Sequence, residues 1–327
     1  MAETITRVSR AVSPAKRQFA HYVTDPHLPF KPGPLTTLDG ISETGEFAYR
    51  YAHNSAGLRD VERPRRKDPA VWRILALGDS FTYGIGAAFE ETYPAQLQAG
   101  LNRRPGRHPP VEVVNAGIPG YFPAAERLFL EHYGVDYAPD LVLVGFLPND
   151  VIDTHMGLGA VVVDRSGYLV TREAARLGSF AMWLTRNSDL ARLVLGRFQM
   201  SEGYRTVRWR ELHQSNGFHE KDWRAIEREL EQMVTLARRV DARVVVISIP
   251  ERGPWTEKHR YPAERLGAWA SRHGAELIDV LPALAEATGR HPSPPLYYEK
   301  DGHCTPAGYA VIASEVSRAL AERKLVP

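Results

Sequence analysis

The segment from Val71 to Ala87 constrains the fold of this chain more than any other. It reads V-W-R-I-L-A-L-G-D-S-F-T-Y-G-I-G-A, and Gly78 closes its opening run of mostly apolar strand formers. An apolar run without polar alternation is typical of a buried parallel strand, because helices cover both faces of such a sheet. The segment therefore predicts the first strand of an α/β sheet, followed by a loop and a helix.

Ser80 follows this strand directly, with Asp79 before it. Ligands of open α/β sheets bind just beyond the carboxyl ends of the strands, so Ser80 lies where a nucleophile would be useful. Asp and Ser are also common residues at the start of a helix, where their side chains accept backbone N–H bonds. Taken alone, the segment leaves both interpretations open.

Four more short apolar segments repeat the strand pattern, and helical patterns separate them. Five such strands alternating with helices predict a parallel sheet in a three-layer α/β/α arrangement. The further strands are expected at residues 111–115, 141–146, 243–249 and 276–280, and the helices at 92–103, 124–133, 221–239, 263–273 and from Pro306 to about 323.

Two regions depart from this alternation. Residues 1–68 are rich in proline and lack a clear period, which predicts an irregular arm, with short strands around 46–51, packed on a main domain of residues 69–327. Residues 151–220 form a long insertion after the third strand, and long connections are commonly functional. Their apolar residues recur at near-helical spacing and include Trp183 and Phe198. We expect a helical cap whose apolar face is either buried on the domain or also lines a substrate site.

Charge and cysteine content narrow the class of protein. The net charge is +2, and the basic runs at 63–67 and 103–107 lack interleaved aromatic residues, so neither a nucleic-acid nor a membrane-surface partner is indicated. The N-terminus has no continuous apolar core of a secretory signal, and no run of about 18 apolar residues could span a membrane. The single cysteine, Cys304, excludes an intramolecular disulfide. These features predict a cytoplasmic globular protein.

Polar and glycine residues follow the strands at what should be one edge of the sheet: Ser80, Gly120, Asn149, Asp301 and His303. A serine hydroxyl needs a histidine to take its proton, and a carboxylate orients that histidine. Oxyanion donors must already be in place. The set predicts acyl transfer with Ser80 as nucleophile, His303 as base and Asp301 as acid. The Ser80 N–H, the Gly120 N–H and the Asn149 amide would form an oxyanion hole.

These residues lie in four ordered blocks that resemble those of the SGNH (GDSL-type) hydrolases. The blocks are G-D-S at 78–80, N-A-G-I-P-G at 115–120, G-F-L-P-N-D at 145–150 and D-G-H at 301–303. The resemblance implies a flavodoxin-like sheet and metal-free hydrolysis of esters, with the site residues in the roles given above. The segment N-S-A-G-L-R-D at 54–60 resembles a stretch that precedes the first block in one bacterial branch of the family.

The blocks depart from the usual pattern at three places. Phe81 replaces the leucine of the first block, and the third block is two residues longer than the short G-x-N-D form. The usual acid position, three residues before the histidine, holds Lys300, whereas Asp301 lies two residues before it, as in some carbohydrate O-acetyl esterases. Glu299 or a backbone carbonyl could support His303 instead.

Other chemistry is less well supported by the sequence. Asp79 and Asp150 are expected to be structural, Asp150 as a brace for Asn149, and Cys304 is an alternative but disfavoured nucleophile. No complete dinucleotide fingerprint, P-loop or H-E-x-x-H motif is present, so we expect no cofactor and no metal. No G-x-S-x-G elbow surrounds any serine, which disfavours an α/β-hydrolase. The best-supported prediction is a serine esterase acting on a small or medium-sized ester. An acyltransferase with the same acyl-enzyme, or a biosynthetic or binding protein that keeps the fold, remains an alternative.

Overall fold

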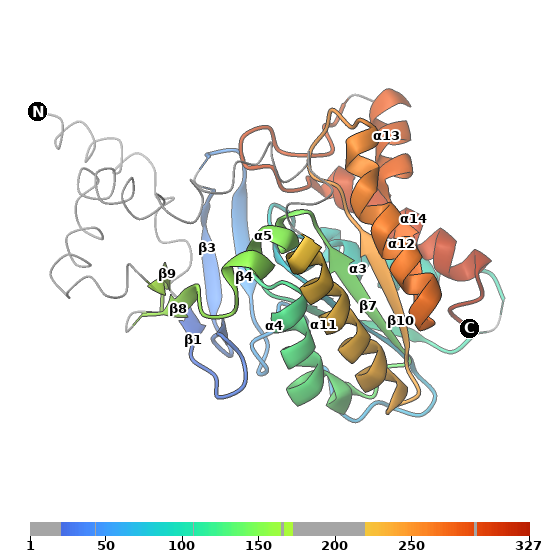
Figure 1. The fold of residues 1–327 in the computed structure, drawn as a ribbon, viewed down its shortest axis with the longest axis horizontal. Helices are drawn as coiled ribbons and strands as arrows, with labels where there is room; N and C mark the ends of the chain where they lie inside the picture. The colour runs from blue at the N-terminus through green and yellow to red at the C-terminus, as the bar shows by residue number, and fades with distance from the viewer. Residues whose placement is uncertain (1–20, 43, 107, 165–166, 173–219, 291–292) are drawn as a thin grey trace, which may run out of the picture.

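A five-stranded parallel sheet forms the centre of the molecule (Figure 1). The computed structural model describes residues 21–42, 44–106, 108–164, 167–172, 220–290 and 293–327. The strands lie in the order β11–β10–β7–β5–β6. Their bounds are β5 Trp72–Gly78, β6 Val111–Gly117, β7 Leu141–Phe146, β10 Arg243–Ser248 and β11 Glu276–Asp279.

The strand order is that of a flavodoxin-like sheet, and it confirms the predicted fold. The first strand of the sheet, β5, pairs with β6 on one side and with β7 on the other. The chain thus adds β6 on one side of β5 and then β7, β10 and β11 on the other side. Ligands of such sheets bind at this reversal point, beyond the carboxyl ends of the two inner strands. Ser80 follows β5 and Asn149 follows β7, so both lie at that point.

Helices cover both faces of the sheet. Alternate residues of β5 enter opposite cores: Ile74 and Ala76 pack on one face, and Leu75 and Leu77 on the other. The first face is covered by α3 Tyr93–Asn102, α13 Leu281–Arg290 and α14 Pro306–Glu322. The second is covered by α4 Pro123–Phe129, α11 Glu220–Arg238 and α12 Tyr261–His273, with α4 and α11 side by side (Figure 1). Short helical turns are η2 Phe89–Glu91, η3 Leu130–Gly134, η4 Val135–Tyr137 and η5 Glu257–Arg260.

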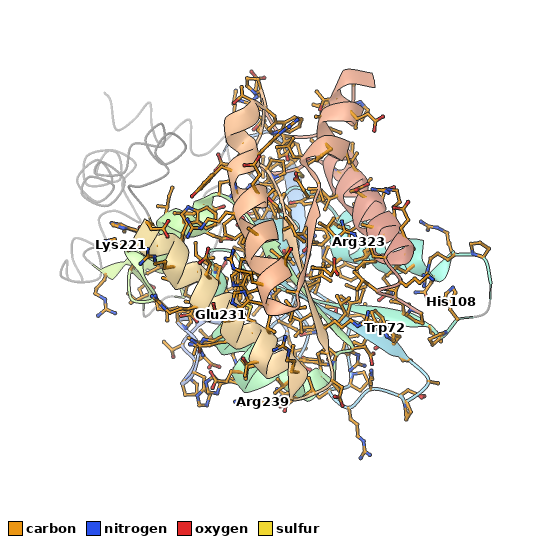
Figure 2. All side chains as sticks on the ribbon, turned by 45° about the vertical axis from the view of Figure 1, so that its right-hand side comes forward. Trp72, His108, Lys221, Glu231, Arg239 and Arg323 are labelled. Atoms are coloured by element: carbon orange, nitrogen blue, oxygen red, sulfur yellow. The ribbon has the colours of Figure 1, made fainter. Side chains whose placement is uncertain are left out.

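The helix α11 shows how an amphipathic sequence pattern places one helix face against the sheet. Trp223, Ile226 and Leu230 recur every three or four residues and are buried against the sheet. Lys221 and Glu231 lie on the exposed side of the same helix (Figure 2). This helix begins and ends within one residue of its predicted position, whereas the sequence reading did not anticipate α13.

The N-terminal region is more regular than its proline content suggests. It contains two antiparallel hairpins, β1 Tyr22–Val23 with β2 Lys31–Pro32 and β3 Thr37–Ile41 with β4 Ala48–Ala52. The second hairpin buries Tyr49 and Tyr51 in a small cluster with Tyr83 and Ile85, which follow Ser80 in the chain. The expected strand around 46–51 corresponds to β4. This hairpin therefore packs directly on the segment that carries the candidate nucleophile.

The predicted cap is described only in part. After β7 the chain forms α5 Asn149–Met156 and an antiparallel hairpin of β8 Val161–Val163 and β9 Leu169–Thr171. Trp183 and Phe198 lie outside the described residues, so their place in a substrate site stays a prediction. Among the helices that the structure describes, none is long and apolar enough to cross a membrane.

Candidate active site

Ser80, His303 and Asp301 form a continuous hydrogen-bonded chain. His303 Nε2 lies 2.8 Å from Ser80 Oγ, and His303 Nδ1 lies 2.5 Å from Asp301 Oδ1. Ser80 is the first residue of α2 (Ser80–Tyr83), directly after β5, whereas the other two lie in the loop before α14. The fold thus brings together residues that are 223 positions apart in the chain. This arrangement lets the imidazole take the serine proton while a carboxylate holds its other nitrogen.

Two glycines make room for the turn that carries Ser80. Gly78 at the end of β5 pairs with Gly117 at the end of β6. A Cβ atom at Gly78 would lie 2.0 Å from Thr82 Oγ1, and one at Gly117 would lie 2.3 Å from the backbone N of Tyr83. Both distances are clashes, so α2 can lie against the strand ends only because neither residue has a side chain.

Asp79 connects the serine turn to Asn149. Its Oδ1 accepts the N–H of Phe81 at 2.8 Å, which caps α2, and its Oδ2 accepts the Asn149 amide at 3.3 Å. The same amide donates to Asp153 Oδ2 at 3.1 Å. Both hydrogens of the Asn149 amide therefore have carboxylate partners. To donate to an oxyanion, the amide would have to release one of them, and the bond to Asp79 is the longer.

The other expected oxyanion donor, Gly120, lies in the loop after β6. Its φ of +81° favours glycine, and the loop is held at the sheet edge because the N–H of Ile118 donates to the Gly78 carbonyl at 3.0 Å. Gly120 is exposed and is not among the residues that line the cavity at Ser80. Its role as a donor remains a prediction.

A cavity of about 400 Å³ opens over Ser80, a size suited to a small ligand. Phe81 and Leu147 form the apolar part of its wall. Glu251 and Arg252, from the loop after β10, also line it. The sequence analysis did not identify Glu251 and Arg252 as site residues, although both follow a predicted strand. The described residues that line the cavity are Asp79, Ser80, Phe81, Leu147, Asn149, Glu251, Arg252, Asp301, Gly302 and His303.

Phe81 and Cys304 flank the histidine in different ways. The ring of Phe81, which replaces the leucine of the first block, lies 4.9 Å from the His303 ring between centroids. Cys304 is fully buried in the core, and burial raises the pKa of its thiol, although a hydrogen bond with Tyr297 opposes the change. A buried, protonated thiol is a poor nucleophile, which argues against the cysteine alternative.

A group of buried carboxyl groups lies behind the serine turn. Burial raises the pKa of Glu126 and Asp150 well above their ordinary values, and the charge of Asp79 adds to the effect in both. Asp150 Oδ2 accepts the N–H of Leu147 at 2.9 Å. Asp150 thus braces the turn before Asn149, while the Asn149 side chain is held by Asp79 and Asp153, a pairing that the sequence did not indicate.

Comparison with known protein families matches residues 76–311 to the family described as GDSL-like lipase/acylhydrolase. The chain belongs to this family. The match begins in β5, just before Ser80, and ends inside α14, so it includes all of the blocks identified in the sequence. Comparison with curated proteins gives no match.

Several solved structures resemble this chain at low sequence identity. The crystal structure of TesA is 17% identical, with 76% of this chain and 98% of that chain covered and a TM-score of 0.46. A catalytic mutant of Axe2, an acetylxylan esterase from Geobacillus stearothermophilus, is 17% identical, with 76% and 93% covered and a TM-score of 0.45. A putative lipolytic protein of the G-D-S-L family from Desulfitobacterium hafniense DCB-2 is 15% identical, with 76% and 99% covered and a TM-score of 0.45. Similarities this low carry no argument about activity.

The motif at 54–60 has a structural role in this GDSL-like hydrolase. Arg59 is buried and donates hydrogen bonds to the carbonyls of Tyr83 and Gly84 at 3.0 and 2.6 Å and to that of Ala87 at 2.6 Å. Its guanidinium also lies 4.2 Å from the centre of the Tyr51 ring. Arg59 therefore fixes the end of the nucleophile turn from a segment that the sequence analysis could not connect to the site.

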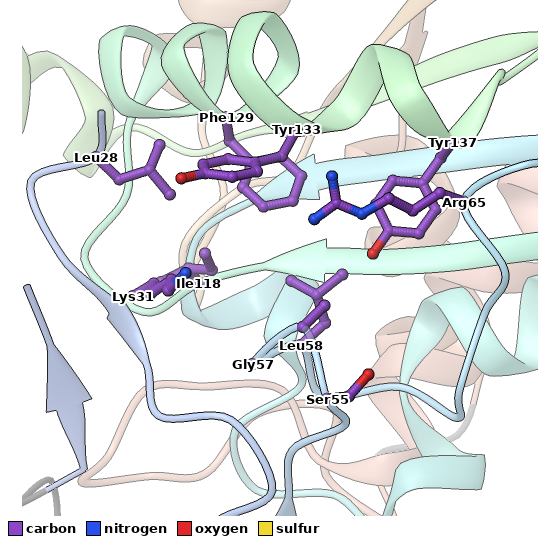
Figure 3. A pocket seen from close by; sticks show the side chains of 11 residues that line it. Leu28, Lys31, Ser55, Gly57, Leu58, Arg65, Ile118, Phe129, Tyr133 and Tyr137 are labelled. Atoms are coloured by element: carbon purple, nitrogen blue, oxygen red, sulfur yellow. The ribbon is translucent and has the colours of Figure 1, made fainter. Parts of the chain in front are cut away.

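A second cavity, of about 110 Å³, lies between the N-terminal region and α4 (Figure 3). Leu58, Ile118 and Phe129 form its apolar wall. Among the described residues that line it, Ser55 is the single serine and donates to Glu62 Oε2 at 2.7 Å, and none is a histidine. In the described part of the chain, groups of three or more His, Cys, Asp or Glu residues placed to hold a metal ion are absent.

Asp153 should make the stability of the protein dependent on pH. Burial raises its pKa to about 6, and the charge of Asp79 adds to this, while the Asn149 bond opposes it. The unfolded chain releases the proton at lower pH, so this stability is full below the ordinary carboxyl pKa and is lost as pH rises through about 6. We expect wild type to lose about 2–3 kcal/mol more than Asp153→Asn between about pH 4 and 7.5. Urea unfolding at both pH values measures the difference, and equal losses would contradict the prediction.

Proposed function

We propose that this protein is a serine-dependent ester hydrolase that acts through an acyl-Ser80 intermediate. The observation that carries the proposal is the hydrogen-bonded chain from Asp301 through His303 to Ser80. Such a chain activates a hydroxyl that is otherwise a weak nucleophile. Membership of the GDSL-like lipase/acylhydrolase family supports the same class of reaction.

The first half of the reaction forms the acyl-enzyme. Ser80 Oγ attacks the ester carbonyl carbon while His303 Nε2 takes the hydroxyl proton, and Asp301 stabilises the resulting imidazolium. The carbonyl oxygen becomes an oxyanion, for which the N–H groups of Ser80 and Gly120 and the Asn149 amide are the proposed donors. Collapse of the tetrahedral intermediate breaks the ester bond, and His303 returns its proton to the leaving alcohol.

The second half releases the acid. A water molecule enters the cavity, gives a proton to His303 Nε2 and attacks the acyl carbon. The second tetrahedral intermediate then collapses, the bond to Ser80 Oγ breaks, and the serine regains its proton from the imidazole. The cavity of about 400 Å³ over Ser80 supports a small or medium-sized ester as substrate.

A panel of p-nitrophenyl esters from acetate to octanoate tests this function. We expect turnover to fall as the acyl chain outgrows the cavity, with free carboxylic acid as the product. Adding glycerol as an alternative acceptor distinguishes hydrolysis from transfer. Mostly free acid at molar glycerol would support a hydrolase, whereas acyl-glycerol as the main product would instead identify an acyltransferase. No release of p-nitrophenol from any ester would contradict both.

A further inference from the structure

Residues 298–303 form the acid loop, which carries Asp301. Two backbone hydrogen bonds between its ends close this loop. The N–H of Tyr298 donates to the His303 carbonyl at 2.9 Å, and the N–H of Gly302 donates to the Tyr298 carbonyl at 3.2 Å. Gly302 adopts a φ of +87°, and a Cβ atom there would meet no atom within 4 Å. Neighbouring described side chains therefore do not pack on Gly302.

The carboxylate of Glu46 binds the tip of the acid loop. It accepts the backbone N–H groups of Glu299 at 2.8 Å, Lys300 at 3.0 Å and Asp301 at 2.7 Å. Three successive N–H groups around one carboxylate form an anion-binding concavity, and bonds to a charged acceptor are stronger than neutral ones. Partial desolvation would raise the pKa of Glu46, but these bonds and the Thr44 hydroxyl outweigh it, and the pKa lies below its ordinary value.

The hairpin that carries Glu46 is itself fixed. Ser42 Oγ is buried at the turn between β3 and β4 and accepts the N–H groups of Glu46 at 3.0 Å and Phe47 at 3.3 Å. The ring of Phe47 lies 4.6 Å from that of Tyr298 in the acid loop. The Tyr298 hydroxyl in turn donates to the carbonyl of Gly86, beyond the nucleophile turn, at 2.7 Å. The hairpin therefore contacts the two segments that carry the acid and the nucleophile.

We propose that Glu46 is a positioning residue that acts through Asp301. By anchoring the N–H of Asp301 and its two preceding residues, it keeps the Asp301 carboxylate on Nδ1 of His303. The inference rests on the proposed function of the Asp301–His303–Ser80 chain and gives the N-terminal hairpin a role in it. A residue 255 positions from the acid in sequence thereby sets the geometry of the base.

Substitution of Glu46 should lower turnover without weakening substrate binding. We expect Glu46→Ala to reduce kcat for p-nitrophenyl acetate by about 10- to 100-fold, the effect typical of a displaced catalytic group, with KM changed by less than about twofold. Glu46→Gln keeps one acceptor oxygen but turns an NH₂ toward a donor, so an intermediate loss is expected. Asp39→Asn, an exposed carboxylate in the same hairpin, is the matched control and should leave kcat unchanged.

A double-mutant cycle shows whether Glu46 acts through Asp301. In an Asp301→Asn background, adding Glu46→Ala should cost less than about twofold, because the contact it maintains is already lost. The downfield proton resonance of His303 Nδ1–H, assigned by its loss in Asp301→Asn, should broaden or shift in Glu46→Ala. Three results would overturn the proposal. The losses in kcat from Glu46→Ala and Asp301→Asn could multiply in the double variant, or the resonance could be unchanged in Glu46→Ala. The fall in kcat of Glu46→Ala could also be accompanied by a lower melting temperature that accounts for it.

The resonance also separates this proposal from the proposed function. If Ser80→Ala retained hydrolysis while the resonance still responded to Glu46→Ala, the proposed function would fail and the positioning role would stand. If Ser80→Ala were inactive while Glu46→Ala behaved as wild type in both readouts, only the positioning role would fail.

Discussion

The Ser80→Ala variant is expected to lose ester hydrolysis almost completely. Alanine removes the only atom that lies within hydrogen-bond distance of His303 Nε2 among the described side chains, so no acyl-enzyme can form at this site. Loss of the nucleophile in serine hydrolases costs roughly 10⁶-fold in kcat. Steady-state release of p-nitrophenol from the acetate ester, followed alongside labelling by a fluorophosphonate, measures the effect.

Ser55→Ala is the matched control for this experiment. Ser55 lines the second cavity and is bound to Glu62, away from His303, so its loss should change neither turnover nor labelling. Undiminished labelling of Ser80→Ala would show that the reactive serine lies elsewhere. Unchanged turnover of the same variant would remove the basis of the proposed mechanism.

The Asp301→Asn variant is expected to show the second largest loss. An asparagine at this position can present an amide NH₂ to His303 Nδ1, which favours the wrong tautomer for accepting the Ser80 proton. In a serine protease the equivalent change lowers kcat by about 10⁴-fold, and we expect roughly 10²- to 10⁴-fold here, with a smaller change in KM. Steady-state kinetics with the acetate ester measures kcat and KM separately.

Two other carboxyl groups, Glu299 and Asp150, provide controls for the assignment of Asp301 as the residue that supports His303. Glu299 is exposed, and its backbone, not its side chain, is bound by Glu46. Asp150 is buried and accepts the N–H of Leu147 through Oδ2, a bond that the side-chain oxygen of an asparagine can also accept. Glu299→Gln and Asp150→Asn should each cost less than about tenfold in kcat. A larger loss in Glu299→Gln than in Asp301→Asn would assign the supporting carboxylate to Glu299.

The sheet could be predicted from the sequence because its strands are buried on both faces. Four of the five strands are mostly apolar and buried runs, whereas the edge strand β11 has a charged residue at each end and only Ile278 buried. The predicted and observed bounds of the strands differ by at most two residues. The N-terminal hairpins were harder to predict, because β3 and β4 are half-exposed and only alternate residues such as Tyr49 and Tyr51 are buried. The helix α13 was missed.

The candidate site was predictable only as far as its residues follow strands. The sheet topology places Ser80 and Asn149 at one edge, so their proximity follows from the strand pattern. The contacts that hold them come from segments that no local pattern connects to that edge. Arg59 binds the end of the nucleophile turn, Glu46 binds the acid loop, and Asp153 holds the Asn149 amide from one helical turn further along α5.

Direct detection of the acyl-enzyme tests the central claim most sharply. Wild-type protein mixed with p-nitrophenyl acetate, quenched in acid and digested with trypsin, should give an acetylated peptide from Ile74 to Arg103, with the acetyl group on Ser80. This adduct should form and decay at least as fast as steady-state turnover and should be absent in His303→Ala. Acetylation of a different residue, or an adduct on Ser80 that decays more slowly than turnover, would contradict the account.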